Sequence, residues 1–209
     1  MGDRLFSPRD FRIFEIPDFA GRMAAIAGEV RPKLTRVGEV LSPDISRLVG
    51  APVFAHVAKH ARRTVNPPED TWVAFGPDRR GYKKDVHFKV AISRNCIRLL
   101  FEVGPEYQNK RGWASRWERR PGDLLALLKR ARGIGWFKDE HDEDPAAEVK
   151  DLGPEQIRNI LQELSRKREG QLVFGRRLSQ AGGSAMTLEA FRKEALGTFR
   201  GLAPVYRRR

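Results

Sequence analysis

Apolar residues recur at every third or fourth position in several stretches of the chain, and this spacing predicts helices with one buried face. The longest such stretch runs from Ala20 to Leu41, where Pro32 is expected to kink the helix or divide it in two. Other helices are marked by a capping residue, usually with a proline in the first turn. Proline is tolerated there because the N–H groups of the first turn have no partner within the helix. They are predicted to start around Ser7, Ser42, Pro121, Gly153 and Thr187, and Gly50 is expected to end the second of them.

Alternating apolar and polar positions predict strands between these helices. From Asp85 to Ile92 the even positions are apolar, and the short connection Ser93–Asn95 leads into the apolar run Cys96 to Val103, which indicates an antiparallel hairpin. Residues 52–58 are predicted to form a further short strand, and residues 135–137 and 171–174 are weaker candidates. The order of elements along the chain is helices, then a hairpin, then alternating helices and strands. This order predicts an α+β fold with a mixed, mainly antiparallel sheet packed by helices. We expect a single domain over residues 1–209.

Composition and the amino-terminal sequence indicate the cellular compartment in which the protein is expected to work. Cys96 is the only cysteine, so no internal disulfide forms and a reducing compartment is expected. The amino terminus, MGDRLFSPRDF, carries charges where a signal peptide has its apolar core, and no apolar run reaches the roughly 18 residues that span a bilayer. We therefore expect a cytoplasmic protein with no membrane contact, while the sequence leaves its oligomeric state open.

The charge balance is strongly basic, with 40 Lys and Arg against 27 Asp and Glu and a formal net charge of +13. Such a field favours polyanionic partners, among them nucleic acid and phosphorylated metabolites. The alternative is that the charge serves solubility alone. Net charge by itself does not separate the two interpretations.

Residues 56–88 concentrate the polar chemistry, with three of the four histidines and seven Lys or Arg. Guanidinium groups pair with phosphate or carboxylate, histidine exchanges a proton near neutral pH, and Trp or Tyr stacks on planar groups. The run Asn66-Pro67-Pro68 predicts a stiff, non-helical connection. The alternative is a pair of solvated basic loops around a core strand. The candidate ligand-binding residues are His56, His60, Arg62, Arg63, Asn66, Trp72, Arg80, Tyr82, Lys83 and His87.

The same segment resembles a known family. The run from His56 to Trp72, followed by Arg80 to Lys84 and by His87-Phe88, closely resembles the YktB-like, UPF0637-type family of uncharacterised bacterial proteins, which is catalogued as a domain of unknown function. The likeness extends to the Phe11–Met23 region and to the Pro204–Tyr206 ending, so it covers essentially the whole chain. It implies a single α+β domain with a large sheet packed by helices. It implies no activity and carries over no functional residue.

Signatures of metal sites and of nucleophilic catalysis are weak. His56 and His60 have the spacing of two ligands on one helical face, but the glutamate of a zinc-protease motif is missing between them, and on a strand they would stand roughly 13 Å apart. Cys96 lies in an apolar strand, where a cysteine is usually structural. No glycine-rich phosphate loop and no dinucleotide fingerprint is present. No metal and no cofactor are therefore expected, and no catalytic residue is assigned.

A second basic stretch, Lys110 to Arg120, interleaves cations with Trp113 and Trp117. This pattern suits unpaired bases on a phosphate backbone, or else two core anchors beneath an Arg-rich surface. The acidic run from Asp139 to Asp144 is expected to be a solvated loop.

These observations favour a protein that binds a phosphate-bearing or otherwise anionic ligand, nucleic acid included, through residues 56–88. One alternative is a small enzyme that acts on an anionic metabolite, with His60 or His87 as acid/base and Arg62 and Arg63 clamping the charge. Another is a structural or regulatory partner protein, which predicts an exposed apolar patch. Whether the protein is an enzyme stays open at this point.

Overall fold

A curved sheet of seven strands forms the centre of the molecule, and its neighbouring strands pair antiparallel. The computed structural model describes residues 3–61 and 63–206. The predicted α+β class, with a mainly antiparallel sheet packed by helices, is confirmed. In spatial order the strands are β1 (Phe54–Val57), β2 (Asp70–Gly76), β3 (His87–Ser93), β4 (Cys96–Val103), β7 (Leu172–Ser179), β5 (Gly135–Phe137) and β6 (Ala147–Glu148).

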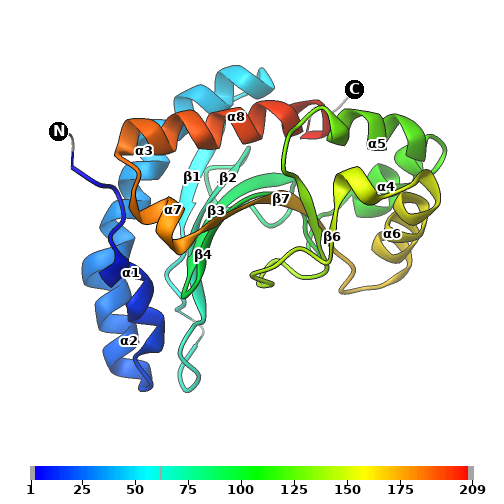
Figure 1. Cartoon of the computed structure of the whole chain (residues 1–209). Helices are drawn as coiled ribbons and strands as arrows, with labels where there is room; N and C mark the ends of the chain where they lie inside the picture. The colour runs from blue at the N-terminus through cyan, green and yellow to red at the C-terminus, as the bar shows by residue number, and fades with distance from the viewer. Residues whose placement is uncertain (1–2, 62, 207–209) are drawn as a thin grey trace.

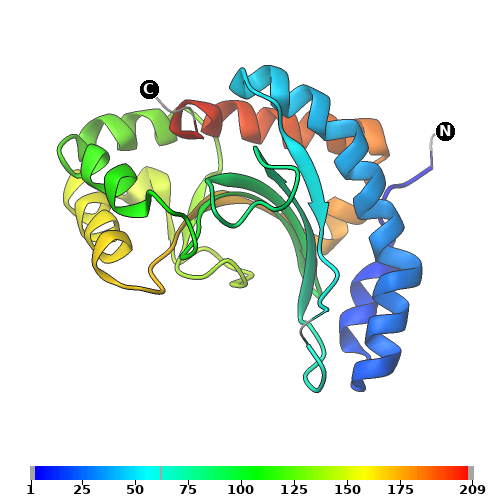
Figure 2. The ribbon, with the colours of Figure 1, turned by 180° about the vertical axis from the view of Figure 1, so that it is seen from behind.

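Helices cover the convex face of the sheet and one of its ends (Figure 1). Helices α3 and α8 lie side by side across the convex face, whereas α4, α5 and α6 form a separate group at the β6 end. The view from behind shows loops along the concave face (Figure 2). The helices are α1 (Pro8–Arg12), η1 (Ile13–Glu15), α2 (Phe19–Ala25), η2 (Ile26–Val30), α3 (Arg31–Val49), α4 (Lys110–Glu118), α5 (Pro121–Lys129), η3 (Val149–Asp151), α6 (Pro154–Arg166), α7 (Gln180–Ser184) and α8 (Leu188–Tyr206).

Every second residue of the central strands faces the helices and fills the main core. Phe88 of β3 stacks against Phe199 and Tyr206 of α8, with ring centroids 4.7 and 5.0 Å apart. The residues between these core positions face the concave side, and on β3 and β4 they too are buried. We call this concave side the polar face, because it carries His87 and Lys89 of β3 and Arg98 and Glu102 of β4.

The first long helix is less interrupted than the sequence predicts. Residues 19–49 are helical throughout, passing from α2 through the π-turn η2 into α3. Pro32 has no N–H for the helical ladder, and the π-turn just before it accommodates the mismatch, with the N–H of Arg31 bonded to a carbonyl five residues back. The predicted division at Pro32 and the separate helix starting at Ser42 are therefore wrong. Gly50 ends α3 in the left-handed conformation, at a φ of 75°, as predicted.

The remaining predicted helix starts agree with the structure, but several elements were not predicted, β2 and α4 among them. Helices α1, α5, α6 and α8 begin where their caps indicate, and the Thr187 hydroxyl accepts the N–H of Ala190 at 3.3 Å. β2 was missed, and so was α4, which turns the second basic stretch into a helix with Trp113 and Trp117 buried at 4% and 8% exposure. Among the residues that the structure describes, no helix is long and apolar enough to cross a membrane.

Candidate functional site

The polar face holds an unusual density of buried charge. Strand register places His87 directly opposite Glu102, while Lys89 lies next to Ala74 of β2 on the same face. The side chains of His87 and Lys89 are 1% exposed and that of Glu102 is 3% exposed. Removing charged groups from water costs free energy unless they are paired and hydrogen-bonded. The contacts within this cluster therefore have to offset that cost.

Glu102 is the centre of the first group of contacts. Its carboxylate pairs with the Lys89 ammonium at 2.8 Å and meets His87 Nε2 at 3.2 Å, and Lys89 also pairs with Glu140. Burial alone would raise the pKa of Glu102, but the charges of Lys89 and His87 hold it well below the usual range. The other ring nitrogen of His87 donates to the Asp85 carbonyl at 3.0 Å. Both nitrogens of this ring therefore have a hydrogen-bond partner.

Asp70 is the centre of the second group. Its carboxylate pairs with Arg98 at 2.5 Å and accepts from His141 Nδ1 at 3.0 Å. Burial would raise the pKa of Asp70, but the hydrogen bond from His141 and the charge of Arg98 lower it below the ordinary value. Arg98 also donates from Nη1 to the carbonyls of Glu140 and Asp142, at 2.6 and 2.9 Å.

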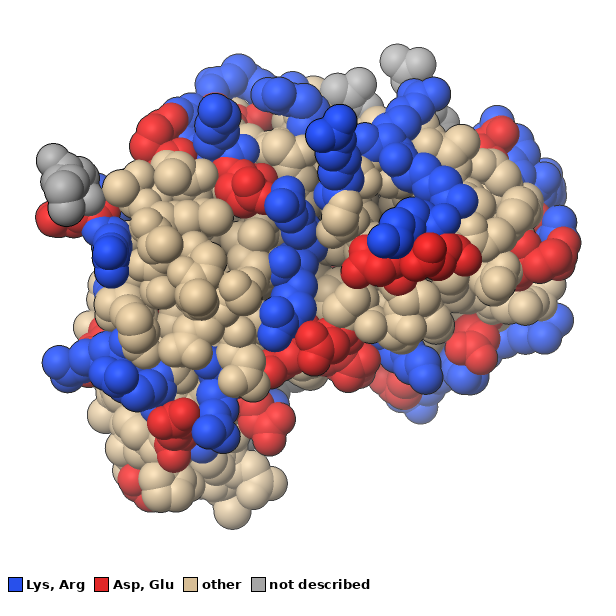
Figure 3. All heavy atoms as spheres, in the orientation of Figure 1, with Lys and Arg blue, Asp and Glu red and all other residues tan. Residues whose placement is uncertain are grey.

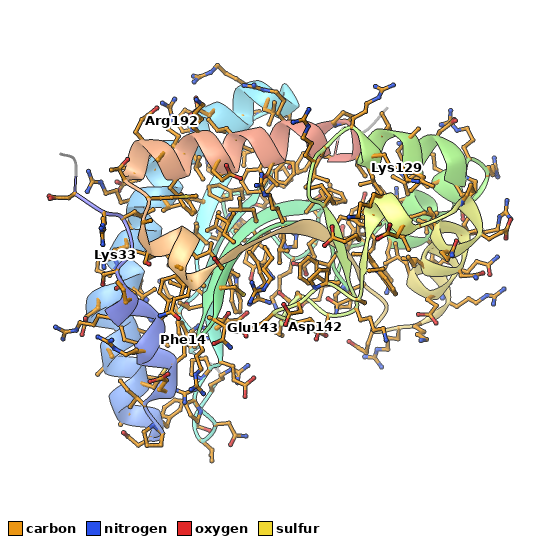
Figure 4. All side chains as sticks on the ribbon, in the orientation of Figure 1. Phe14, Lys33, Lys129, Asp142, Glu143 and Arg192 are labelled. Atoms are coloured by element: carbon orange, nitrogen blue, oxygen red, sulfur yellow. The ribbon has the colours of Figure 1, made fainter. Side chains whose placement is uncertain are left out.

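These bonds hold residues 138–146, which we call the 138–146 loop, against the polar face. Figure 4 shows Asp142 and Glu143 of this loop below the sheet. Glu143 accepts the backbone and side-chain N–H groups of Asn95 at 3.2 and 2.6 Å, and its carbonyl accepts from Arg177 at 3.1 Å. The acidic run is thus bound to the sheet through several of its residues, whereas the sequence predicts a solvated loop.

Trp72 and Tyr82 join the 58–69 and 77–86 loops to the polar face. The indole N–H of Trp72 donates to the Tyr82 hydroxyl at 2.8 Å, and the Lys89 ammonium lies 4.9 Å from the Trp72 ring centroid. All four histidines of the chain contact one of these two rings. His60 and His141 lie 5.2 and 5.8 Å from Trp72, and His56 and His87 lie 5.8 and 4.7 Å from Tyr82, between ring centroids.

His60 has the least ordinary environment of the four histidines. Its φ is 52°, and it is the one non-glycine residue with a positive φ in the described part of the chain. Such a backbone conformation is rare outside glycine and needs support from surrounding contacts. Here the ring packs edge-on against Trp72, and Nε2 lies 3.0 Å from the Thr71 hydroxyl. Burial, together with the charges of Arg63 and Arg31, lowers the pKa of His60 to about 4, against the opposing effect of Asp70.

The other predicted residues lie nearer the surface. His56 donates from Nε2 to the Asp78 carbonyl at 2.9 Å, while Arg63 and Asn66 are exposed in the 58–69 loop. On the 77–86 loop, Arg80 is exposed and Lys83 pairs with Glu106 at 3.2 Å. Arg62 lies outside the described residues. The structure thus brings His56, His60, Trp72, Tyr82 and His87 together, and it leaves the described cations of this segment at the rim.

Several residues of this cluster were missed from the sequence. Arg98 and Glu102 are polar residues at alternate positions of an apolar strand, a signal that was available next to His87 and Lys89. Asp70 was not among the candidate residues. Glu140 and His141 reach the cluster through a long-range contact of their loop, for which no local pattern exists.

Other chemistry is absent or structural in the described residues. No group of three or more His, Cys, Asp or Glu side chains there has the geometry to hold a metal ion. Cys96 is buried beside Ser93, and burial raises the pKa of its thiol, which opposes a thiolate role. Lys110, from the second basic stretch, donates to the carbonyls of Lys167, Arg168 and Gly170 at 3.0, 2.7 and 3.0 Å.

Comparison with known proteins places the chain in a family. A family model described as a domain of unknown function (DUF1054) matches residues 6–206. The UPF0637 protein of Staphylococcus carnosus is 32% identical over 206 residues, covering 99% of this chain and 100% of its own. Those of Bacillus licheniformis and Bacillus velezensis are 32% and 33% identical, covering 99% and 96% of this chain and 97% and 94% of their own. The chain therefore belongs to the UPF0637 family of uncharacterised bacterial proteins, as its residues 56–88 predict.

Proposed function

We propose that the protein binds a small anionic ligand beside His60 and Trp72, within reach of the charge of Arg31 at the start of α3. The observation that carries this proposal is the environment of His60, a half-buried histidine with a positive φ, whose pKa is lowered to about 4 by burial and by the charges of Arg63 and Arg31. A phosphate or carboxylate bound there would relieve the excess of positive charge.

Arg31 supplies an independent argument for an anion. Its Nε is buried and has no hydrogen-bond partner among the described residues. An unpaired buried donor costs free energy, and strained or orphaned polar groups cluster at functional sites. A guanidinium has five N–H donors in a fork that matches an oxyanion, so a ligand oxygen would satisfy this group.

Trp72 favours a planar or apolar part in the same ligand. Its ring is half-buried and stands next to His60 and His141 at the surface end of the cluster. His87, by contrast, is 1% exposed with both nitrogens engaged, so we assign it the role of positioning Tyr82 and Glu102. A ligand would meet Trp72 and His60 before it met His87.

A small ligand fits these residues better than nucleic acid does. Trp113 and Trp117 are buried, and Lys110 is bound to three carbonyls, so the second basic stretch offers neither stacking faces nor that cation. On the face shown in Figure 3, Lys and Arg gather over the upper part and in a run down the middle, and acidic side chains stand in separate groups beside them. A polymer would be expected to follow a continuous basic groove.

A second candidate function is acid–base catalysis on the bound anion, with His60 as the base. An anion beside His60 would offset the charges of Arg31 and Arg63 and raise the pKa of His60 towards its ordinary value. A histidine is most effective as a base when its pKa lies near the working pH. The contact of His60 Nε2 with Thr71 leaves Nδ1 as the nitrogen that would face a substrate.

The test is calorimetric titration of the protein with inorganic phosphate, adenosine 5′-monophosphate and single-stranded RNA at low and high salt. We expect the two small anions to bind, and we expect Arg31→Gln and His60→Gln each to weaken binding by about tenfold or more. Arg36→Gln is the matched control, because Arg36 lies on the exposed side of the same helix. Tight RNA binding without binding of either small anion would favour a polymer, and no binding of any of the three would remove the proposal.

A further inference from the structure

A cleft of about 660 Å³ lies between α6 and the end of β5, and no part of the proposed function uses it. Three segments of the chain supply most of its lining. They are the side of α6 that carries Asn159 and Glu163, Trp136 of β5 with the two residues after that strand, and residues 167–171 before β7. A volume of this size lies within the range of pockets for small metabolites, roughly 300–1,000 Å³.

The apolar part of the wall includes an accessible indole. Leu152 and Ile160 are 8% and 7% exposed and contribute aliphatic surface. The Trp136 side chain packs against the core on one side only and is half-buried, whereas Trp113 and Trp117 are buried. An indole that is open to a cleft offers a ligand a large, rigid apolar surface.

The polar groups of the wall are planar, and two of them are held in position. Gln171 Nε2 donates to Asp139 Oδ2 at 2.6 Å, and the N–H of His141 donates to Asp139 Oδ1 at 2.8 Å. A carboxylate has about four acceptor positions, so Asp139 keeps two for a ligand, and the Gln171 amide keeps its oxygen and a second N–H. Asn159 is exposed, and its side chain forms no hydrogen bond with another residue that the structure describes.

The charges that line the cleft leave no group of unpaired ions of one sign. The lining contains two lysines and three acidic residues. Lys167 pairs with Glu163 at 3.3 Å, and Glu169 meets Arg168 at 3.6 Å. The remaining two, Lys138 and the hydrogen-bonded carboxylate before His141, are of opposite sign. An ionic ligand would therefore meet like charges here, and a wholly apolar one would displace water from the amides without replacing its hydrogen bonds.

We infer that this cleft binds a neutral, polyhydroxylated ring, and specifically a pyranose sugar. One face of such a ring consists of C–H groups, whose slight positive charge suits the negative face of the Trp136 indole. Hydroxyl groups stand around the ring and both donate and accept, so they match polar groups that come from three segments, Asn159, Asp139 and Gln171. This site is separate from the His60 corner, and its occupation does not depend on the proposed function.

The experiment is a ligand-observed NMR screen of the full chain against glucose, galactose, mannose and N-acetylglucosamine at roughly 10 mM, a range that detects weak binding. The best sugar is then compared with its uronic acid and its amino sugar, each of which adds one charge to the ring, and with adenosine. We expect at least one neutral sugar to bind and each of the three comparison compounds to bind about tenfold more weakly. If no neutral sugar binds, or if a comparison compound binds as well as the best sugar, the inference is wrong.

Variants locate the binding. Trp136→Ala removes the indole, Asn159→Ala removes the exposed amide, and each is expected to weaken the best sugar by about tenfold. Gln162→Ala removes an amide of the same helix outside the lining and should leave binding unchanged, as should His60→Gln, which separates this site from the anion site. Trp136 packs partly against the core, so the circular dichroism of its variant is compared with that of the native protein. Unchanged binding in Asn159→Ala, or in a natively folded Trp136→Ala, would overturn the assignment.

Discussion

The indole N–H of Trp72 donates to the hydroxyl of Tyr82 at 2.8 Å, and the two rings together contact all four histidines of the chain. The histidines come from β1, the adjoining 58–69 loop, β3 and the 138–146 loop, so this one hydrogen bond lies where these four segments meet. Beneath it lie the buried contacts of Lys89 with Glu102. The pair therefore links the surface end of the cluster to its buried end.

The first prediction concerns that hydrogen bond. Tyr82→Phe removes the hydroxyl and leaves the half-buried Trp72 N–H without its acceptor. We expect the free energy of unfolding to fall by about 1–2 kcal/mol. Urea denaturation of the variant, of Trp72→Phe and of the double variant measures the coupling between the two residues. Additive losses would show that the bond contributes nothing.

The second prediction concerns Glu102, whose carboxylate contacts two buried side chains, Lys89 and His87. Glu102→Gln keeps the shape but removes the charge, and we expect the free energy of unfolding to fall by about 3–5 kcal/mol, as for other broken buried pairs. Glu106→Gln is the matched control, because Glu106 forms a half-exposed ion pair with Lys83. Its loss should be about 1 kcal/mol or less. Similar losses in the two variants would contradict our account of the network.

The third prediction is a pH dependence that comes from His60. Because its folded-state pKa is about 4, below the unfolded value of roughly 6.5, the unfolded chain binds more protons between these values. Stability contributed by His60 is therefore present above about pH 6.5 and falls as the pH drops towards 4. After allowance for its partial exposure, the loss is on the order of 1–2 kcal/mol.

Chemical denaturation of the native protein and of His60→Gln between pH 7.5 and 4.5 measures the contribution of His60 to the free energy of unfolding. The variant should lose less stability over that range. Asp70 and Glu102, with lowered pKa values, add a further loss at more acidic pH in both proteins, because their contribution disappears as the pH falls through their folded pKa values. Parallel curves for the two proteins would rule out the lowered pKa of His60.

The fourth prediction concerns domain organisation, for which the sequence predicts one domain over the whole chain. Helix α8 packs on α3, on α5 and on β4, so it joins the convex layer to the helices at the β6 end. We expect circular dichroism and tryptophan fluorescence to report one coincident unfolding transition in urea. Two separated transitions would indicate that the group of α4, α5 and α6 unfolds independently.

Local signals explain what the sequence could predict of the fold. The β3–β4 hairpin follows from strict alternation and a short connection, and the helix starts follow from caps and prolines, all of which act over a few residues. β2 was missed because Asp70–Gly76 is almost wholly buried and shows no alternation, and because Pro67-Pro68 stands just before it. Pro32 was expected to kink the helix or divide it in two, but the helix continues through a single π-turn.

Part of the candidate site could also be predicted from local signals in the sequence. One segment of the chain, residues 56–88, contains five of the residues in the cluster, so their grouping is visible in the sequence alone. They are His56, His60, Trp72, Tyr82 and His87. Arg98 and Glu102 join them only because β4 pairs with β3, and His141 only because its loop lies against the polar face. Such contacts depend on tertiary structure, and a single sequence carries no local pattern for them.

The most direct test of the anion site is an NMR titration of the His60 ring from pH 3 to 8, with and without inorganic phosphate. We predict a pKa of about 4 in the free protein, because of burial and of the charges of Arg63 and Arg31, and a clear rise when phosphate is bound. Resonances of His56 serve as an internal control, since its Nε2 is bonded to a backbone carbonyl on the 77–86 loop. A pKa near the ordinary value of roughly 6.5, or one that phosphate leaves unchanged, would contradict the proposed anion site.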